Sequence, residues 1–227
     1  PLSEALLTPP FSAKDLFMDY ILALDTTIGG FTLALGQQGV LLGGVADATP
    51  RSSSALHPAL EIILKQNDTK PNQIKTIAIM VGPGSFTGCR IGKAFAESWR
   101  LAQPQVRVVG LSTLAVLARQ AIVLGVAEPF RVLLDAAGGQ VYGQDFNAQG
   151  TPQAAAFCLP LAEAVATPLP VVAAHLPLCD AAKWHIGGVT PEVLFEAVQD
   201  TSLHGPAEIV YLKDLNYKTK TQALGAA

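Results

Sequence analysis

Residues 81–92 read VGPGSFTGCRIG, and this glycine-rich stretch decides the fold class of the chain. Residues 76–81 (TIAIMV), just before the first glycine, form an apolar run rich in β-branched side chains, which is typical of a buried strand. The apolar residues that follow recur at the spacing of one helical face; they are Ile91, Ala94, Phe95 and Trp99. The sequence therefore predicts a strand, a glycine turn and a helix from Gly88, which is the repeating unit of α/β folds.

Two interpretations of this turn are open. Glycine lets another backbone approach closely, and the N–H groups at the start of a helix could hold an anion such as a phosphate. The same glycines are equally required if the turn only packs the helix tightly on the sheet. In either case Ser85 or Thr87 can accept a hydrogen bond from the first turn of the helix.

The first half of the chain predicts a meander followed by alternating helices and strands. Residues 20–25, 31–35 and 40–45 are extended segments separated by glycine turns. The later elements are a helix from Ser53, the strand from Thr76, the helix from Gly88, a strand over residues 106–111 and a helix capped by Ser112.

A second copy of this pattern begins about 110 residues later, where residues 132–135 (VLLD) echo residues 22–25 (LALD) and two glycines follow each. Two such halves predict an α/β protein with a duplicated ribonuclease H-like fold and two lobes, the architecture of actin and the sugar kinases. The predicted divisions are 18–111 for the first lobe, 112–204 for an eroded second lobe, and 205–227 for a C-terminal strand (208–212) and tail. Residues 1–17 show no periodicity and are interpreted as a disordered or start extension.

The composition limits the function. Only 15% of the residues are charged and 50% are hydrophobic, so part of the apolar surface is expected to meet a partner. A net charge of −3 gives no basic field for holding a nucleic acid alone. The longest apolar run, residues 111–127, contains polar side chains and is too short to span a membrane. Cys89, Cys158 and Cys179 are widely spaced, which indicates neither a disulfide framework nor a zinc site and fits a reducing cytoplasm.

Residues 82–92 (GPGSFTGCRIG) resemble the signature of the TsaB (YeaZ) family of bacterial tRNA threonylcarbamoyladenosine biosynthesis proteins, and only Cys89 departs from it. Residues 21–27 (ILALDTT) and 110–114 (GLSTL) are similar to two further segments of that family. Residues 52–57 (SSSALH) depart from the family pattern, in which a histidine and a glutamate are common.

The resemblance implies a non-catalytic cytoplasmic subunit that binds TsaD and supports threonylcarbamoyl transfer to adenosine of tRNA. It also implies TsaE as a further partner, tRNA contact only through the complex, and a homodimer when the chain is alone. The partner surface is expected on the helices from Ser53 and Gly88. Its expected residues are Leu56, Leu60, Lys93, Ala96, Glu97 and Arg100.

No catalytic residue and no metal site are expected. The histidines at positions 57, 175, 185 and 204 include no pair four residues apart, which a helical two-histidine metal site requires. The TsaD family, which resembles the TsaB family in fold and performs the transfer, carries such a pair for iron or zinc. Ser85 lies in a glycine loop but not in a G-x-S-x-G nucleophile elbow.

An ATP-binding enzyme of the same fold, an ATPase or small-molecule kinase, is the alternative interpretation. Nucleotide-binding relatives place a carboxylate where this chain has Asp25, although Asp25 could equally cap the following turn. The candidate loop for ATP or ADP with Mg²⁺ comprises Asp25, Thr26, Thr27, Gly82, Gly84, Ser85, Thr87 and Gly88. Against it, Asp135 in the second half is followed by two alanines, and no intact adenosine loop is visible, so no cofactor is expected. A nuclease ranks third, because Asp25 and Asp135 belong to different predicted lobes.

Overall fold

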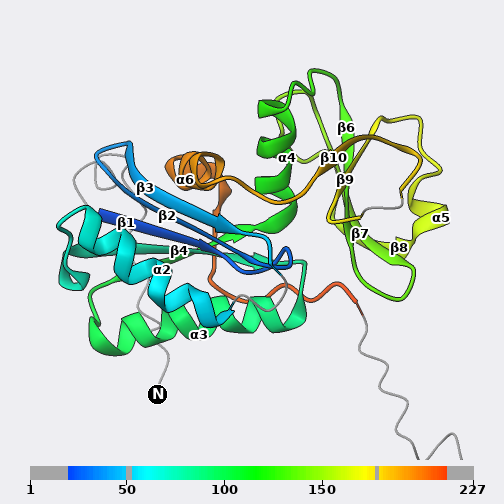
Figure 1. Cartoon of the computed structure of the whole chain (residues 1–227). Coiled ribbons are helices and arrows are strands. Elements are labelled where there is room, and N and C mark those ends of the chain that lie inside the picture. Colours follow the sequence, from blue (N-terminus) through cyan, green and yellow to red (C-terminus); the bar gives the residue numbers. More distant parts are fainter. Residues whose placement is uncertain (1–19, 50–52, 177–178, 214–227) are drawn as a thin grey trace, which may run out of the picture.

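The computed structural model describes residues 20–49, 53–176 and 179–213, which form two β-sheets with helices around and between them (Figure 1). The interpretation of residues 1–17 as an extension lies outside the described residues. The first sheet and most of its helices form one lobe, and the second sheet forms the other.

Among the described residues, the first sheet has six strands in the order β11-β5-β4-β1-β2-β3. Their bounds are β1 (Tyr20–Asp25), β2 (Phe31–Gln37), β3 (Val40–Asp47), β4 (Ile74–Gly82), β5 (Arg107–Ser112) and β11 (His204–Gly205). The first three form the predicted antiparallel meander, β4 is parallel to β1, and β5 is parallel to β4. Side chains of β1 alternate between two buried clusters, with Leu22 and Leu24 in one and Ile21 and Ala23 in the other.

Two pairs of helices cover the two faces of this sheet. On the face of Leu22 lie α2 (Ser53–Gln66) and α3 (Phe86–Ala102), with the short turn η1 (Pro71–Gln73) between them in sequence. On the face of Ile21 lie α4 (Thr113–Val123) and α6 (Pro191–Gln199). The helix ends follow the sequence, because Ser85, Ser112 and Thr190 each accept a hydrogen bond from a backbone N–H of the first turn.

The second sheet repeats the arrangement of the first. Its described strands are β6 (Phe130–Asp135), β7 (Gln140–Phe146), β8 (Phe157–Pro160), β9 (Val171–Ala174) and β10 (Ala182–Ile186), in the order β10-β9-β6-β7-β8. Strands β6, β7 and β8 are antiparallel neighbours and β9 is parallel to β6, as β4 is to β1. The helix α5 (Leu161–Ala164) is short. The duplicated ribonuclease H-like fold with two lobes is therefore confirmed.

The last helix of the predicted second lobe (residues 112–204) is α6, and it packs on the first sheet and not on the second. Helix α6 packs on β2 and β3, where glycines make room for it. An ideal Cβ on Gly36 would lie 2.2 Å from the Phe195 ring, and one on Gly44 would lie 2.2 Å from the Pro191 Cβ. Helix α4 lies between the sheets and shares one buried cluster with both of them (Figure 1).

The prediction of a C-terminal strand over residues 208–212 is wrong. After the turn η2 (Thr201–Leu203), the strand β11 pairs antiparallel with β5 over only two residues. Pro206 follows at once, and proline has no N–H to continue a ladder. Residues 206–213 therefore leave the sheet and run toward the second lobe (Figure 1).

Candidate functional site

The start of α3 packs directly on the turn that follows β1. The Thr26 hydroxyl donates to the Gly88 carbonyl at 2.6 Å, and the Ser85 backbone N–H donates to the Thr27 carbonyl at 2.8 Å. Ser85 also caps the helix by accepting from the Gly88 N–H at 3.2 Å. These groups, which were candidates for holding a phosphate, therefore bond within the protein.

Close contact explains the glycines of this turn. An ideal Cβ on Gly88 would lie 1.8 Å from the Thr26 carbonyl oxygen, and one on Gly84 would lie 2.7 Å from the Thr27 carbonyl oxygen. Neither glycine has a positive φ, whereas Gly82 has φ +102°. Close packing against the turn after β1 is therefore sufficient to explain why residues 84 and 88 are glycines.

Asp25 caps the turn after β1. Its Oδ1 accepts from the Thr27 N–H at 2.6 Å and from the Thr27 hydroxyl at 2.7 Å, and that hydroxyl lies 3.0 Å from the Thr113 hydroxyl. Asp25 is only 3% exposed, and burial raises its pKa from the ordinary 3.8 to about 6 against the lowering effect of the threonine hydrogen bonds. It borders a cavity of about 250 Å³ that also touches residues 187–191.

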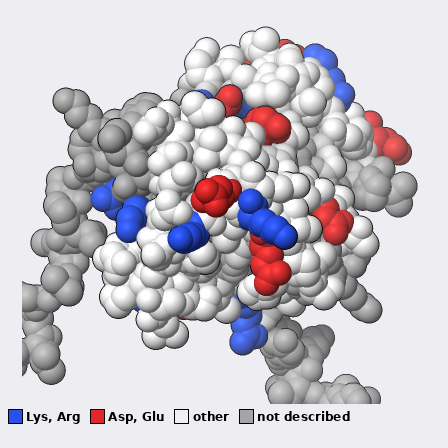
Figure 2. Space-filling view, turned by 60° about the vertical axis from the view of Figure 1, so that its left-hand side comes forward, with Lys and Arg blue, Asp and Glu red and all other residues white. Residues whose placement is uncertain are grey.

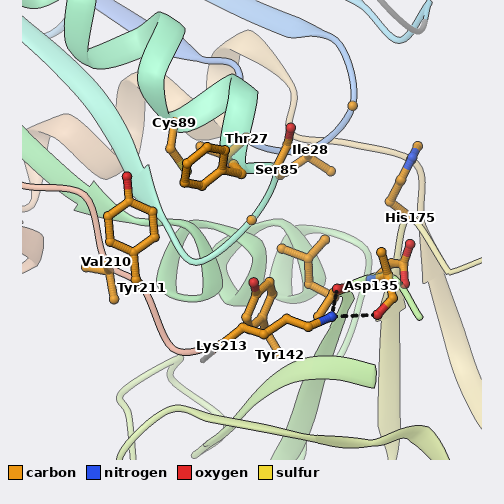
Figure 3. Close-up of a pocket in the computed structure, with 16 residues that line it drawn as sticks. Thr27, Ile28, Ser85, Cys89, Asp135, Tyr142, His175, Val210, Tyr211 and Lys213 are labelled. Carbon is orange, nitrogen blue, oxygen red and sulfur yellow. Dashed lines mark hydrogen bonds between the residues drawn. The ribbon is translucent and has the colours of Figure 1, made fainter. Parts of the chain in front are cut away.

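A larger cavity of about 500 Å³ lies between the lobes (Figure 3). Three parts of the chain build its wall: the loop and helix start at Thr27 and Ser85, the second-lobe residues Tyr142 and His175, and the C-terminal segment ending at Lys213. The wall is mostly apolar and includes three aromatic rings, those of Phe86, Tyr142 and Tyr211.

Only part of the predicted nucleotide loop reaches this cavity. Thr27, Gly84 and Ser85 line it, whereas Asp25 borders the smaller cavity instead. Sequence reasoning missed Tyr142, His175 and Lys213, because they come from segments far apart in the chain. A signal did exist for His175, which directly follows the short apolar strand β9.

Metal-binding groups do not gather in the described part of the chain. No set of three or more histidine, cysteine, aspartate or glutamate side chains there could hold a metal ion. The thiol of Cys89, which lines the larger cavity, has its pKa raised to about 11 by burial and by the Asp25 carboxylate. That thiol is therefore protonated near neutral pH.

The structure corrects three residues of the predicted partner surface. Leu56 and Leu60 on α2 are 4% and 8% exposed and lie in the buried cluster beneath that helix. Ala96 on α3 is 1% exposed, whereas Ala94 is exposed. The reason is the row of small residues Gly88, Gly92 and Ala96, which faces the sheet side of α3 and allows close packing.

The other three predicted surface residues do lie at the surface. The Lys93 ammonium is 3.0 Å from a Glu208 carboxylate oxygen and 4.0 Å from one of Glu97, and Arg100 is 3.6 Å from Glu97. Large apolar side chains lie exposed on the same two helices, with Ile62 of α2 at 55% and Leu101 of α3 at 85%.

Comparisons with known proteins place this fold in one family. The protein-family model described as tRNA N6-adenosine threonylcarbamoyltransferase (TsaD) matches residues 42–175. The tRNA threonylcarbamoyladenosine biosynthesis protein TsaB of Escherichia coli (strain K12) is 30% identical over 127 residues, 56% of this chain and 54% of that protein. TsaB of Bacillus subtilis (strain 168) is 33% identical over 125 residues, 54% of this chain and 52% of that protein. The solved structure of YeaZ from Pseudomonas aeruginosa has a TM-score of 0.71 at 26% identity and covers 86% of this chain and 100% of its own.

The chain belongs to this family, in its TsaB (YeaZ) branch. The resemblance seen in residues 82–92 is thereby confirmed. In sequence, the chain spans about half the length of the curated TsaB relatives that it matches. For this TsaB homologue, none of the helices in the described ranges is long and apolar enough to cross a membrane.

Proposed function

We propose that this TsaB homologue acts in tRNA threonylcarbamoyladenosine biosynthesis as a non-catalytic subunit that binds and supports TsaD. The observation that carries the proposal is the match to YeaZ, which covers 86% of this chain. TsaE is proposed as a further partner in the cytoplasm, and tRNA is proposed to reach the chain only through the complex. The net charge of −3 supports the last point.

The geometry of the turns that follow β1 and β6 supports a role without catalysis. The Thr26 and Thr27 hydroxyls are hydrogen-bonded to protein groups, and Asp25 caps its own turn. In the second lobe, Asp135 likewise accepts from the Ala137 N–H at 2.9 Å. Groups that would contact phosphate in a kinase of this fold are thus occupied by the protein itself.

The exposed face of α2 and α3 is the surface that we propose for TsaD and, when the chain is alone, for a second copy. It presents the apolar Ile62 and Leu101, and the small residues Ala94 and Ser98 lie one turn apart on α3, which permits close helix approach. Lys93, Glu97 and Arg100 would flank this contact and set its orientation. Figure 2 shows that Lys and Arg side chains lie next to Asp and Glu side chains on one face of the molecule, so charges of both signs are mixed there.

Replacing Ala94 with arginine is expected to reduce TsaD capture at least about tenfold, because a long charged side chain would be forced into a packed contact. The melting temperature should stay near that of the wild type, because Ala94 is exposed. Pull-down with purified TsaD measures the effect, and the tRNA threonylcarbamoyladenosine content of TsaB-depleted cells carrying the variant measures its consequence.

Val123→Arg is the matched control, because Val123 is 62% exposed at the end of α4, in the other helix layer. It should bind TsaD like the wild type. If Ala94→Arg and Val123→Arg bind TsaD equally well, the partner surface does not include this face of α3. Failure of the wild-type chain to restore the modified nucleoside in depleted cells would contradict the pathway role itself.

The purified chain is expected to bind ATP and ADP with Mg²⁺ more weakly than a Kd of about 1 mM. The reason is that the Thr26 and Ser85 groups of the candidate loop are already bonded within the protein. Isothermal titration calorimetry is the measurement. A saturable heat in the micromolar range that disappears in Ser85→Ala would instead favour the ATP-binding alternative.

A further inference from the structure

The C-terminal segment, residues 206–213, bridges the two lobes. On the first-lobe side, the Lys93 ammonium donates to the Ala207 carbonyl at 3.1 Å, and the Val210 N–H donates to the Val81 carbonyl at 2.9 Å. On the second-lobe side, the Lys213 ammonium donates to the carbonyls of Ala136 and Ala137 at 2.8 and 2.9 Å. The segment is therefore anchored at both ends by hydrogen bonds to different lobes.

Between these anchors the segment forms part of the wall of the larger cavity. Val210, Tyr211 and Lys213 line the cavity, and the Tyr211 ring lies 5.6 Å, centroid to centroid, from the ring of Phe86 (Figure 3). An ideal Cβ on Gly82 would lie 3.1 Å from the Val210 carbonyl oxygen and 3.2 Å from the Cys89 sulfur. The segment thus passes next to Gly82 and close to the Cys89 thiol.

Its attachment is local and shallow. Val210 and Tyr211 are 40% and 53% exposed, and the other apolar side chains of the segment, those of Ala207, Ile209 and Leu212, are only half-buried. Segments with few buried contacts open at a smaller free-energy cost than the whole fold. Cys89, in contrast, is only 3% exposed beneath it.

We propose that residues 206–213 form a strap that closes the cavity between the lobes, and that Lys213 is its latch. When the latch opens, the segment leaves the Ala136 and Ala137 carbonyls, and the part of the cavity that holds the buried Cys89 becomes open to solvent. The strap is a property of the chain itself and does not depend on the proposed role with TsaD. It controls which molecules reach the cavity and limits how far the lobes can separate.

Alkylation of the cysteines by iodoacetamide, followed by mass spectrometry, tests the strap. Cys89 reports on the cavity beneath the strap, and Cys179, which is 3% exposed in the second-lobe cluster, reports on general unfolding. Lys213→Met keeps the aliphatic chain but removes the donors. This variant is expected to raise the labelling rate of Cys89 about tenfold at constant pH, because the hydrogen bonds from the charged Lys213 to the Ala136 and Ala137 carbonyls are lost. The labelling rate of Cys179 should not change.

Lys183→Met is the matched control, because the Lys183 ammonium pairs with Glu128 on the surface, away from the cavity. It should leave the labelling of Cys89 at the wild-type rate. Tyr211→Ala removes the contact with Phe86 and should raise the alkylation rate of Cys89, as Lys213→Met does.

Two results would overturn the strap. An unchanged Cys89 rate in both Lys213→Met and Tyr211→Ala would mean that the segment does not cover the cavity. Equal acceleration of Cys89 and Cys179 would mean that these residues stabilise the whole fold and not a local closure.

Discussion

Replacing Gly88 with alanine is expected to lower the free energy of unfolding by about 3 kcal/mol. The new Cβ would lie 1.8 Å from the Thr26 carbonyl oxygen and 2.8 Å from its carbonyl carbon. Both are backbone atoms of the turn that directly follows β1, and the turn is fixed by the hydrogen bonds of Asp25 and Thr27. The loss should occur although alanine is intrinsically better than glycine in a helix by about 1 kcal/mol.

Urea unfolding followed by circular dichroism measures this effect. Gly187→Ala is the control, because no heavy atom lies within 4 Å of an ideal Cβ on Gly187 and its φ is not positive. That variant should match the wild type within about 0.5 kcal/mol. Equal stability of Gly88→Ala and Gly187→Ala would show that α3 does not need the close contact with Thr26.

Local patterns predict the elements of this fold well. Glycine turns separate the three strands of the first meander, and Ser112 caps the helix that was expected to follow it. These features depend on residues close in sequence, so the sequence alone contains them. The echo of residues 22–25 in residues 132–135 likewise predicts the duplication, because these residues end β1 and β6, and each of these strands lies between an antiparallel and a parallel neighbour in its sheet.

Contacts between distant segments are where prediction fails. Apolar spacing at Ile91, Phe95 and Trp99 leaves either Ala94 or Ala96 free to face inward. In the structure Ala96 faces inward, because it lies on the same face of α3 as Gly88 and Gly92, and α3 approaches Thr26 along that face. A reading of the three small residues at four-residue spacing would have found this.

The candidate site shows the same limit. Asp25, Thr26 and Thr27 were expected in a candidate nucleotide loop, yet their sequence cannot tell whether the hydroxyls face a ligand or the protein. The structure answers this through partners far along the chain, Gly88 for Thr26 and Thr113 for Thr27.

Asp25→Asn is expected to stabilise the protein at pH 7.5 by about 2 kcal/mol. The Asp25 pKa is raised to about 6 in the folded protein from the ordinary 3.8, mainly by burial. The folded state therefore holds a proton more tightly than the unfolded state. This side chain favours folding fully below pH 3.8, and its contribution is lost as the pH rises toward 6.

Asparagine removes the cost of burying the charge and keeps the local geometry. Its side-chain oxygen can still accept the two bonds that Asp25 accepts from Thr27. The full difference between 3.8 and about 6 corresponds to about 3 kcal/mol above pH 6, and loss of the charge from those hydrogen bonds offsets part of it.

Chemical unfolding of wild type and Asp25→Asn between pH 4 and pH 8 measures this contribution. The difference between the two should grow from pH 4 to about pH 6 and stay constant at higher pH. Asp47→Asn is the control with the opposite sign. Hydrogen bonds from Thr49 lower the Asp47 pKa, so that substitution should not stabilise the protein at pH 7.5. If Asp25→Asn loses stability at pH 7.5 and the loss does not depend on pH, the ionised carboxylate is needed for its hydrogen bonds with Thr27, and burial does not govern its pKa.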